Sequence, residues 1–178
     1  LLRTHYLLRT NQDESIDTYN VSASTELHEE MQMTIVAVKY GQLASIWPQL
    51  QNKDQQIPLL FLQNGLAHYE EALQLSHKQI AFSSVQFGAE KVAGNHVVHR
   101  GIGAMKIAVA RGGAGVFQPL QALRSGKLPV SFEEDAEQML LEKALLNCFV
   151  NPMTAVVQMK NGSLVSNANA FQLLQLLY

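Results

Sequence analysis

The sequence is poor in cysteine and in charge. Cys148 is the only cysteine among 178 residues, which excludes a disulfide framework and disfavours a cysteine-based metal site. Charged residues make up 16% of the chain and the formal net charge is −2, which argues against a broad nucleic-acid-binding surface. The six histidines are scattered without an HxxxH pair, so no metal centre is predicted. No apolar run is expected to reach the roughly 20 residues that span a bilayer.

Apolar side chains are plentiful enough for a packed core. They make up 47% of the residues, a level typical of a folded domain rather than a disordered chain. The opening segment "LLRTHYLLRT" has no signal-peptide layout. Together with the single cysteine, this favours a reduced, cytoplasmic setting.

Strands and helices alternate along most of the chain. β-branched and apolar runs predict strands within 33–40, 57–63, 80–90 and 95–109, whereas helical spacing predicts helices within 41–51, 66–75 and 115–128. "HYLLRT" at 5–10 is expected to end a strand. From about residue 136 onward the spacing is helical throughout. The pattern predicts an α/β sheet domain over residues 1–134, followed by the beginning of an all-helical domain over residues 135–178.

A polar stripe runs along the predicted helix in "EKALLNCFVNPMTAVVQMKNG". Lys143, Asn147 and Asn151 follow one another at four-residue steps, so they share a helix face, and Asn161 follows beside a glycine. Buried without partners, each such group would cost about 1–3 kcal/mol, and a small polar ligand would supply those partners. The alternative is a solvated face of an amphipathic helix.

Three further polar residues follow predicted strands. Asn64, in "FLQNGLAH", lies where the carboxyl end of a parallel strand would place a ligand, although Asn-Gly is also a favourable turn dipeptide. Lys39 repeats this placement after "TIVAV" and could equally be an ordinary exposed lysine. Arg9 is expected at the position where an arginine accommodates the 2′-phosphate of NADP in a dinucleotide-binding fold.

No phosphate-binding loop is present. "RGGAG" at 111–115 has neither the GxGxxG nor the Walker spacing and does not open a helix. The acidic run "FEEDAEQ" at 132–138 is expected to cap a helix, because negative charge is favourable at a helix N-terminus.

Taken together, these segments resemble the ketopantoate reductase (2-dehydropantoate 2-reductase) family. "VAVKYGQL", "LLFLQNGLAH" and the "HRGIG" strand occur in the family's order. The family's most specific pattern is a Lys, an Asn four residues later, Asn-Pro four later again and Asn-Gly ten further on. Lys143, Asn147, Asn151-Pro152 and Asn161-Gly162 match every element of this pattern.

The resemblance implies a Rossmann-like NADP-binding domain and hydride transfer from NADPH to the keto carbon of 2-dehydropantoate (ketopantoate), giving (R)-pantoate in pantothenate biosynthesis. By this resemblance Lys143 would be the general acid. Asn147, Asn151 and Asn161 would orient the substrate, and Asn64 would lie between the nicotinamide and the substrate. Lys39, Gly88 and Arg9 would contact the cofactor. No nucleic-acid or membrane partner is expected, and a homodimer is an expectation from the family alone.

The sequence also departs from the family pattern. The family opens with a strand and a GxGxxG loop and continues with further helices, and neither segment is present in these 178 residues. These 178 residues are therefore expected to be either an incomplete sequence or an inactive piece of a longer protein. Two alternatives remain: a related NADP-dependent reductase of another 2-keto acid, and a non-catalytic binding or oligomerisation module.

Overall fold

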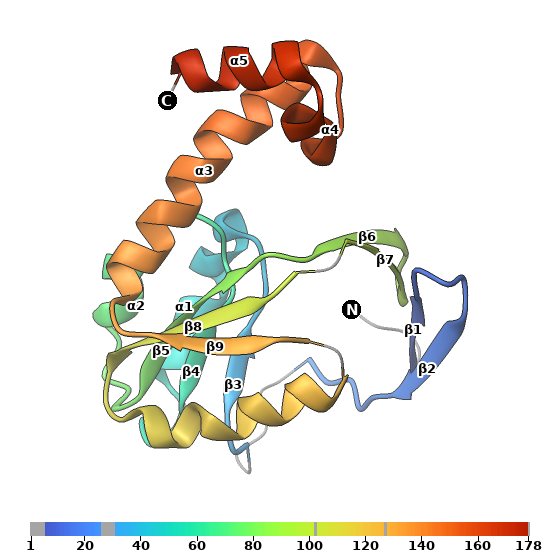
Figure 1. Cartoon of the computed structure of the whole chain (residues 1–178). Coiled ribbons are helices and arrows are strands. Elements are labelled where there is room, and N and C mark those ends of the chain that lie inside the picture. The colour runs from blue at the N-terminus through green and yellow to red at the C-terminus, as the bar shows by residue number, and fades with distance from the viewer. Residues whose placement is uncertain (1–5, 26–30, 102, 127, 178) are drawn as a thin grey trace.

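The computed structural model describes residues 6–25, 31–101, 103–126 and 128–177. These residues form two separate β-sheets and a helical arm (Figure 1). The larger sheet has the order β3-β4-β5-β8-β9, with strands Thr34–Val36, Leu59–Phe61, Ile80–Val85, Met105–Arg111 and Val130–Glu133. The smaller sheet has the order β2-β1-β7-β6, with strands Ile16–Asn20, Tyr6–Thr10, His96–Gly101 and Gly88–Ala93.

The larger sheet is built around three parallel strands. β4 pairs in parallel with both β3 and β5, and all three of its residues are buried, as expected for a central strand covered on both faces. β8 adds to β5 in the antiparallel direction, and β9 is parallel to β8. This arrangement confirms the predicted α/β class.

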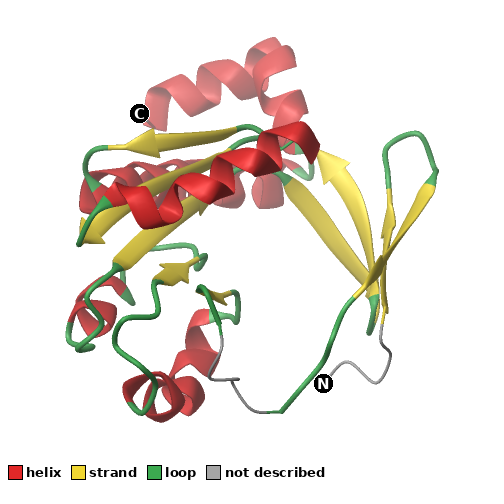
Figure 2. Ribbon diagram, turned by 90° about the horizontal axis from the view of Figure 1, so that it is seen from below, coloured by secondary structure: helices red, strands yellow, loops and turns green. Residues whose placement is uncertain are grey.

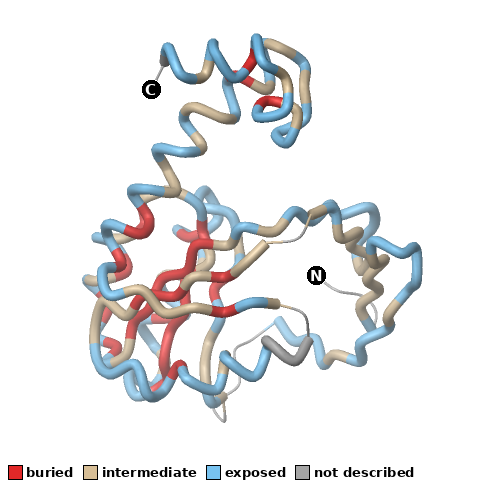
Figure 3. Tube along the Cα trace, in the orientation of Figure 1, coloured by how far each residue is buried: buried red, intermediate tan, exposed pale blue. Residues whose placement is uncertain are grey.

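Helical segments cover both faces of this sheet, and the most buried residues lie between them (Figure 3). On one face pack α1 (Leu43–Gln51), which follows the short η1 (Tyr40–Gln42), then α2 (Tyr69–Leu73) and the first turns of α3 (Ala136–Val157). On the other face, Phe117 of η2 (Ala114–Gly126) packs against Leu60, Ala81 and Ile107. The helix predicted over 115–128 is thus present, but as a 3₁₀ helix.

α3 begins on the sheet and then extends away from it (Figure 1). The Asp135 side chain caps it by accepting a hydrogen bond from the Gln138 N–H at 2.9 Å. The helix ends at Gln158, whose φ of 52° is left-handed, and α4 (Asn161–Ser166) and α5 (Ala168–Leu177) follow. Met153, Leu164 and Ala170 form a small cluster where the three helices meet. The helical prediction is confirmed, while the domain boundary at 134/135 stays a prediction.

The segment containing Arg9 lies elsewhere than expected. Tyr6–Thr10 forms a whole strand, β1, which pairs antiparallel with β2 and parallel with β7 in the smaller sheet (Figure 2). It is not one of the strands of the larger parallel sheet. The prediction that "HYLLRT" ends a strand is confirmed, but this strand belongs to the smaller sheet, so it does not support the position expected of Arg9 in a dinucleotide-binding fold. The strand was predicted from its own sequence, which does not reveal that it pairs with β7.

One helix has the length and composition of a membrane span. α3 has 22 residues and is, by length and composition alone, long and apolar enough to cross a membrane. The expectation that no apolar run is long enough is therefore wrong for this helix. A single such helix is only a weak indication of a span, and the N-terminal turns of α3 pack on the β-sheet through Ala136, Met139 and Leu140.

The fold depends on a close backbone approach at Gly103. A Cβ at this position would collide with the backbone carbonyl of Gln86, in the loop between β5 and β6. We expect Gly103→Ala to lower the free energy of unfolding by about 1–3 kcal/mol, measured by urea denaturation. Gly94→Ala is the control, since nothing lies within 4 Å of a Cβ there. Equal effects of the two substitutions would contradict this account.

Candidate active site

Three predicted site residues follow strands that end at one edge of the larger sheet. The parallel strands β3, β4 and β5 end at Val36, Phe61 and Val85, and Lys39, Asn64 and Gly88 each follow three residues later. The carboxyl ends of parallel strands lie at the same edge of a sheet, which is where open α/β sheets bind ligands. The fold therefore places a cation, a carboxamide and a side-chain-free backbone segment along this edge.

The local sequence shapes the Asn64 loop. Gly65 has a φ of +86°, a left-handed conformation that glycine adopts without strain, and it turns the chain from β4 toward α2. The Lys39 N–H donates to the side-chain oxygen of Gln42 at 3.1 Å, which holds the start of η1. The Lys39 side chain is exposed. Both residues therefore lie on short, backbone-anchored connections at the sheet edge.

Gln63 links these two connections and was missed from the sequence. Its side-chain Nε2 donates to the Val36 carbonyl at 3.1 Å and to the Val38 carbonyl at 2.8 Å. Gln63 therefore bridges the end of β3 to the loop after β4. Its position next to Asn64 was the only available signal, and glutamine at a strand end is not distinctive by itself.

The polar stripe of α3 continues a buried helix face. Ala136 and Leu140 are buried on the sheet. Lys143, Asn147 and Asn151 lie on the same face, because steps of three or four residues along a helix rotate by only about 40–60°. Lys143 and Asn147 are half-buried, and Asn151 is exposed. The face that packs on the sheet thus becomes polar where the helix leaves it.

The opposite side of α3 is apolar and exposed. Leu141, Leu145 and Leu146 are 45%, 50% and 54% exposed. A helix whose polar stripe served only to meet water would instead bury its leucines. α3 thus exposes apolar side chains as well as part of its polar stripe, and the role of the stripe stays a prediction.

Asn161 lies at the far end of the arm. It is the first residue of α4 and is exposed, and α4 packs back on α3 through Leu164 and Met153. Among the described residues, no hydrogen bond or ion pair joins the α3 and α4 polar residues to Lys39 or Asn64. The structure therefore forms two groups, one at the sheet edge and one on the helical arm.

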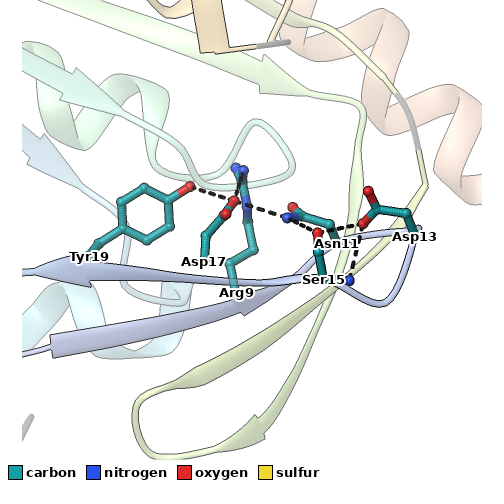
Figure 4. A network of polar contacts seen from close by, with 6 residues as sticks. All are labelled: Arg9, Asn11, Asp13, Ser15, Asp17 and Tyr19. Atoms are coloured by element: carbon teal, nitrogen blue, oxygen red, sulfur yellow. Dashed lines mark hydrogen bonds and ion pairs between the residues drawn. The ribbon is translucent and has the colours of Figure 1, made fainter.

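Arg9 belongs to a polar network on the smaller sheet instead (Figure 4). Its guanidinium contacts the Asp17 carboxylate at 2.7 Å and lies 5.4 Å from the centre of the Tyr19 ring. Hydrogen bonds from Asn11 and Arg9 hold the pKa of Asp17 below its usual range. Arg9 and Asp17 border a cavity of about 880 Å³, with Phe87 and Val97 on another wall. Arg9 lies on the smaller sheet and its charge is paired with Asp17. Its place in the fold therefore does not support the predicted contact with a 2′-phosphate.

His68 is a second residue that the sequence did not reveal. It is fully buried against Phe61 and Phe82, with ring centroids 6.1 and 5.4 Å away. Neither of its ring nitrogens has a hydrogen-bond partner among the described residues. Burial lowers the pKa of His68 to about 4, against a weaker opposing effect of Glu71. The imidazole is therefore neutral near pH 7 and packs as an aromatic side chain below the Asn64 loop.

No metal site emerges from the described part of the chain. Residues 6–25, 31–101, 103–126 and 128–177 contain no group of three His, Cys, Asp or Glu side chains that could hold an ion. The chemistry available at the sheet edge and on α3 is therefore that of ammonium groups and carboxamides.

In open α/β sheets, ligands bind at the carboxyl ends of the parallel strands, where this chain carries polar groups. The model of the family "Ketopantoate reductase PanE/ApbA" matches residues 3–112. This chain belongs to that family. The match covers β1 to β8 and thus the sheet edge, and it ends before α3.

Individual proteins show the same relationship. A 2-dehydropantoate 2-reductase of Listeria monocytogenes is 31% identical over 158 residues, covering 87% of this chain and 52% of that protein. The crystal structure of a probable 2-dehydropantoate 2-reductase of Bacillus subtilis superposes with a TM-score of 0.78 at 26% identity, covering 96% of this chain and 58% of that one. A D-mandelate dehydrogenase in complex with NADH and anilino(oxo)acetate shares the fold, with a TM-score of 0.73 at 16% identity over 94% of this chain and 56% of that one. The chain spans about half the length of the curated relatives it matches.

His68 makes the stability of the fold depend on pH. Because the folded state lowers its pKa from 6.5 to about 4, the unfolded state binds more protons between these values. This contribution is complete above pH 6.5 and is lost as the pH falls toward 4, by on the order of 2–3 kcal/mol. In His68→Leu, we expect urea denaturation to show a flatter dependence of the unfolding free energy on pH across this window. An unchanged slope would contradict burial of a neutral imidazole.

Proposed function

We propose that this chain carries residues of an NADPH-dependent reductase that converts 2-dehydropantoate to (R)-pantoate. Membership of the ketopantoate reductase family supports the reaction class. The observation that carries the proposal is the stripe of Lys143, Asn147 and Asn151, which continues the sheet-packed face of α3. Because the chain spans about half of its curated relatives, the activity is proposed for the whole protein.

The sheet edge fits the nicotinamide end of a dinucleotide. Lys39, Asn64 and Gly88 follow three adjacent strands, and Gly88 pairs with Gly101, so neither residue presents a Cβ there. A flat ring can approach such a backbone closely. The reduced nicotinamide, when bound, supplies the hydride. We propose that Lys39 and Gly88 contact this cofactor and that Asn64 lies between cofactor and substrate.

The α3 stripe would act on the substrate. The Lys143 ammonium donates a proton to the keto oxygen as that oxygen gains negative charge, and its own charge stabilises the developing alkoxide. Asn147, Asn151 and Asn161 each offer two N–H donors and one acceptor, which suits the hydroxyl and carboxylate groups of a keto acid. Closure of the helical arm toward the sheet edge would bring these groups to Asn64.

The same residues are compatible with two alternative functions. The D-mandelate dehydrogenase of the same fold was solved with NADH and anilino(oxo)acetate, so both another 2-keto acid and NADH are candidates. A non-catalytic binding or oligomerisation role is the other alternative. A cytoplasmic location and a homodimer are expectations that the family carries, and a dimeric relative is known from Staphylococcus aureus.

Lys143→Ala tests the proposed proton donor. In the whole natural protein, we expect kcat for 2-dehydropantoate-dependent NADPH oxidation to fall by roughly 10²–10⁴-fold, because a positioned acid contributes about that much. Lys91→Ala is the matched control, since Lys91 is exposed on β6 of the smaller sheet.

The outcomes separate the two parts of the proposal. Equal loss of activity in both lysine variants would contradict the role of Lys143. An inactive wild-type protein would sink the substrate assignment, and other 2-keto acids would then be assayed with both nicotinamide cofactors.

Arg9→Ala tests whether Arg9, on the smaller sheet, contributes to the preference for NADPH over NADH. Because Arg9 lies on the smaller sheet and is paired with Asp17, we expect the ratio of kcat/KM for NADPH and NADH to change by less than about twofold. A selective loss of NADPH use by tenfold or more would contradict this placement. It would restore the original assignment of Arg9 as the 2′-phosphate ligand.

A further inference from the structure

The buried amide of Gln63 is the most constrained polar group at the sheet edge. Only 5% of the residue is exposed. Its Nε2 lies 3.1 Å from the Val36 carbonyl oxygen and 2.8 Å from the Val38 carbonyl oxygen. Because both partners are acceptors, the nitrogen must face them, and this fixes the orientation of the amide.

These two hydrogen bonds connect the segments that carry Lys39 and Asn64. Val36 ends β3, and its carbonyl also accepts the Leu62 N–H at 3.0 Å. Val38 directly precedes Lys39, and Gln63 directly precedes Asn64. One side chain therefore sets the spacing between the two loops.

Burial of the Gln63 amide also costs free energy that an apolar side chain at this position would not cost. Its Oε1 is buried and has no hydrogen-bond partner among the described residues. An unpartnered buried acceptor is unfavourable, and an apolar side chain of similar size would avoid it. Such a side chain would, however, leave the Val38 carbonyl without this donor.

We propose that Gln63 is a positioning residue that holds Lys39 and Asn64 in register for cofactor and substrate. The inference rests on the proposed function for its catalytic consequence, but not for its structural one. Gln63 acts through its neighbours: its Nε2 fixes the backbone at Val38, and its own backbone leads into Asn64 and the left-handed Gly65.

Gln63→Met tests the structural part directly. We expect amide hydrogen exchange in residues 37–42 and 64–66 to become at least about tenfold faster, since a net hydrogen-bond contribution near 1.4 kcal/mol corresponds to a factor of ten. Gln74→Met is the control, because Gln74 is exposed at the end of α2. Unchanged exchange in both loops, or a uniform change throughout the protein, would overturn the proposal.

Gln63→Glu tests the catalytic part in the whole natural protein. A carboxylate cannot donate to Val38, so we expect kcat to fall about tenfold at pH 7.5, with a smaller change in the KM for the keto acid. A protonated carboxyl can donate again, so activity relative to wild type should recover as the pH falls. A loss of kcat independent of pH would overturn the donor role.

The two proposals fail in distinguishable ways. A wild-type protein that neither binds NADPH nor reduces 2-dehydropantoate would reject the proposed function. The exchange measurement on Gln63→Met would still decide whether Gln63 positions the two loops. Faster local exchange with unaltered kcat would reject only the link between positioning and catalysis.

Discussion

Parallel pairing of β4 with β3 on one side and β5 on the other is the constraint on which the site depends. It brings residues from three distant parts of the chain to one edge, because each parallel strand needs a crossover before the next begins. α1 and α2 are these crossovers, and their apolar residues fill the core over Phe61 and Phe82. Lys39, Asn64 and Gly88 become neighbouring positions along that edge only through this pairing.

α3 links the sheet core to the helical arm. Ala136, Met139 and Leu140 anchor its first turns, and the same face then presents Lys143 and Asn147. The helix therefore cannot rotate about its axis without pulling apolar residues out of the core. Anchoring by packing thus fixes the direction in which an ammonium group and two carboxamides point. Leu141, Leu145 and Leu146 remain exposed on the rest of the helix surface.

Apolar spacing and short motifs predicted the features that depend on residues close together in the sequence. Strand β4, helix α1 and the long run of α3 follow from apolar spacing, and the Lys/Asn/Asn-Pro/Asn-Gly spacing identified the family. The placement of β1 did not follow, because pairing with β7 is settled by residues more than 80 positions away. For the same reason the sequence did not predict the sheet on which Arg9 lies. Gln63 and His68 were missed because their significance lies in burial and in carbonyl partners from other strands, which no local pattern encodes.

The central proposal is that Asn64 at the sheet edge and the α3 stripe contact the same substrate, beside the bound cofactor. The most direct measurement is a side-chain amide NMR titration of the whole natural protein with NADP⁺ and 2-dehydropantoate. When 2-dehydropantoate is titrated at saturating NADP⁺, we expect the signals of Asn64, Asn147, Asn151 and Asn161 to shift together with one dissociation constant. The signal of Asn52, which is exposed at the end of α1, should not move. Shifts confined to the sheet edge, with the three asparagines of α3 and α4 unmoved, would contradict it.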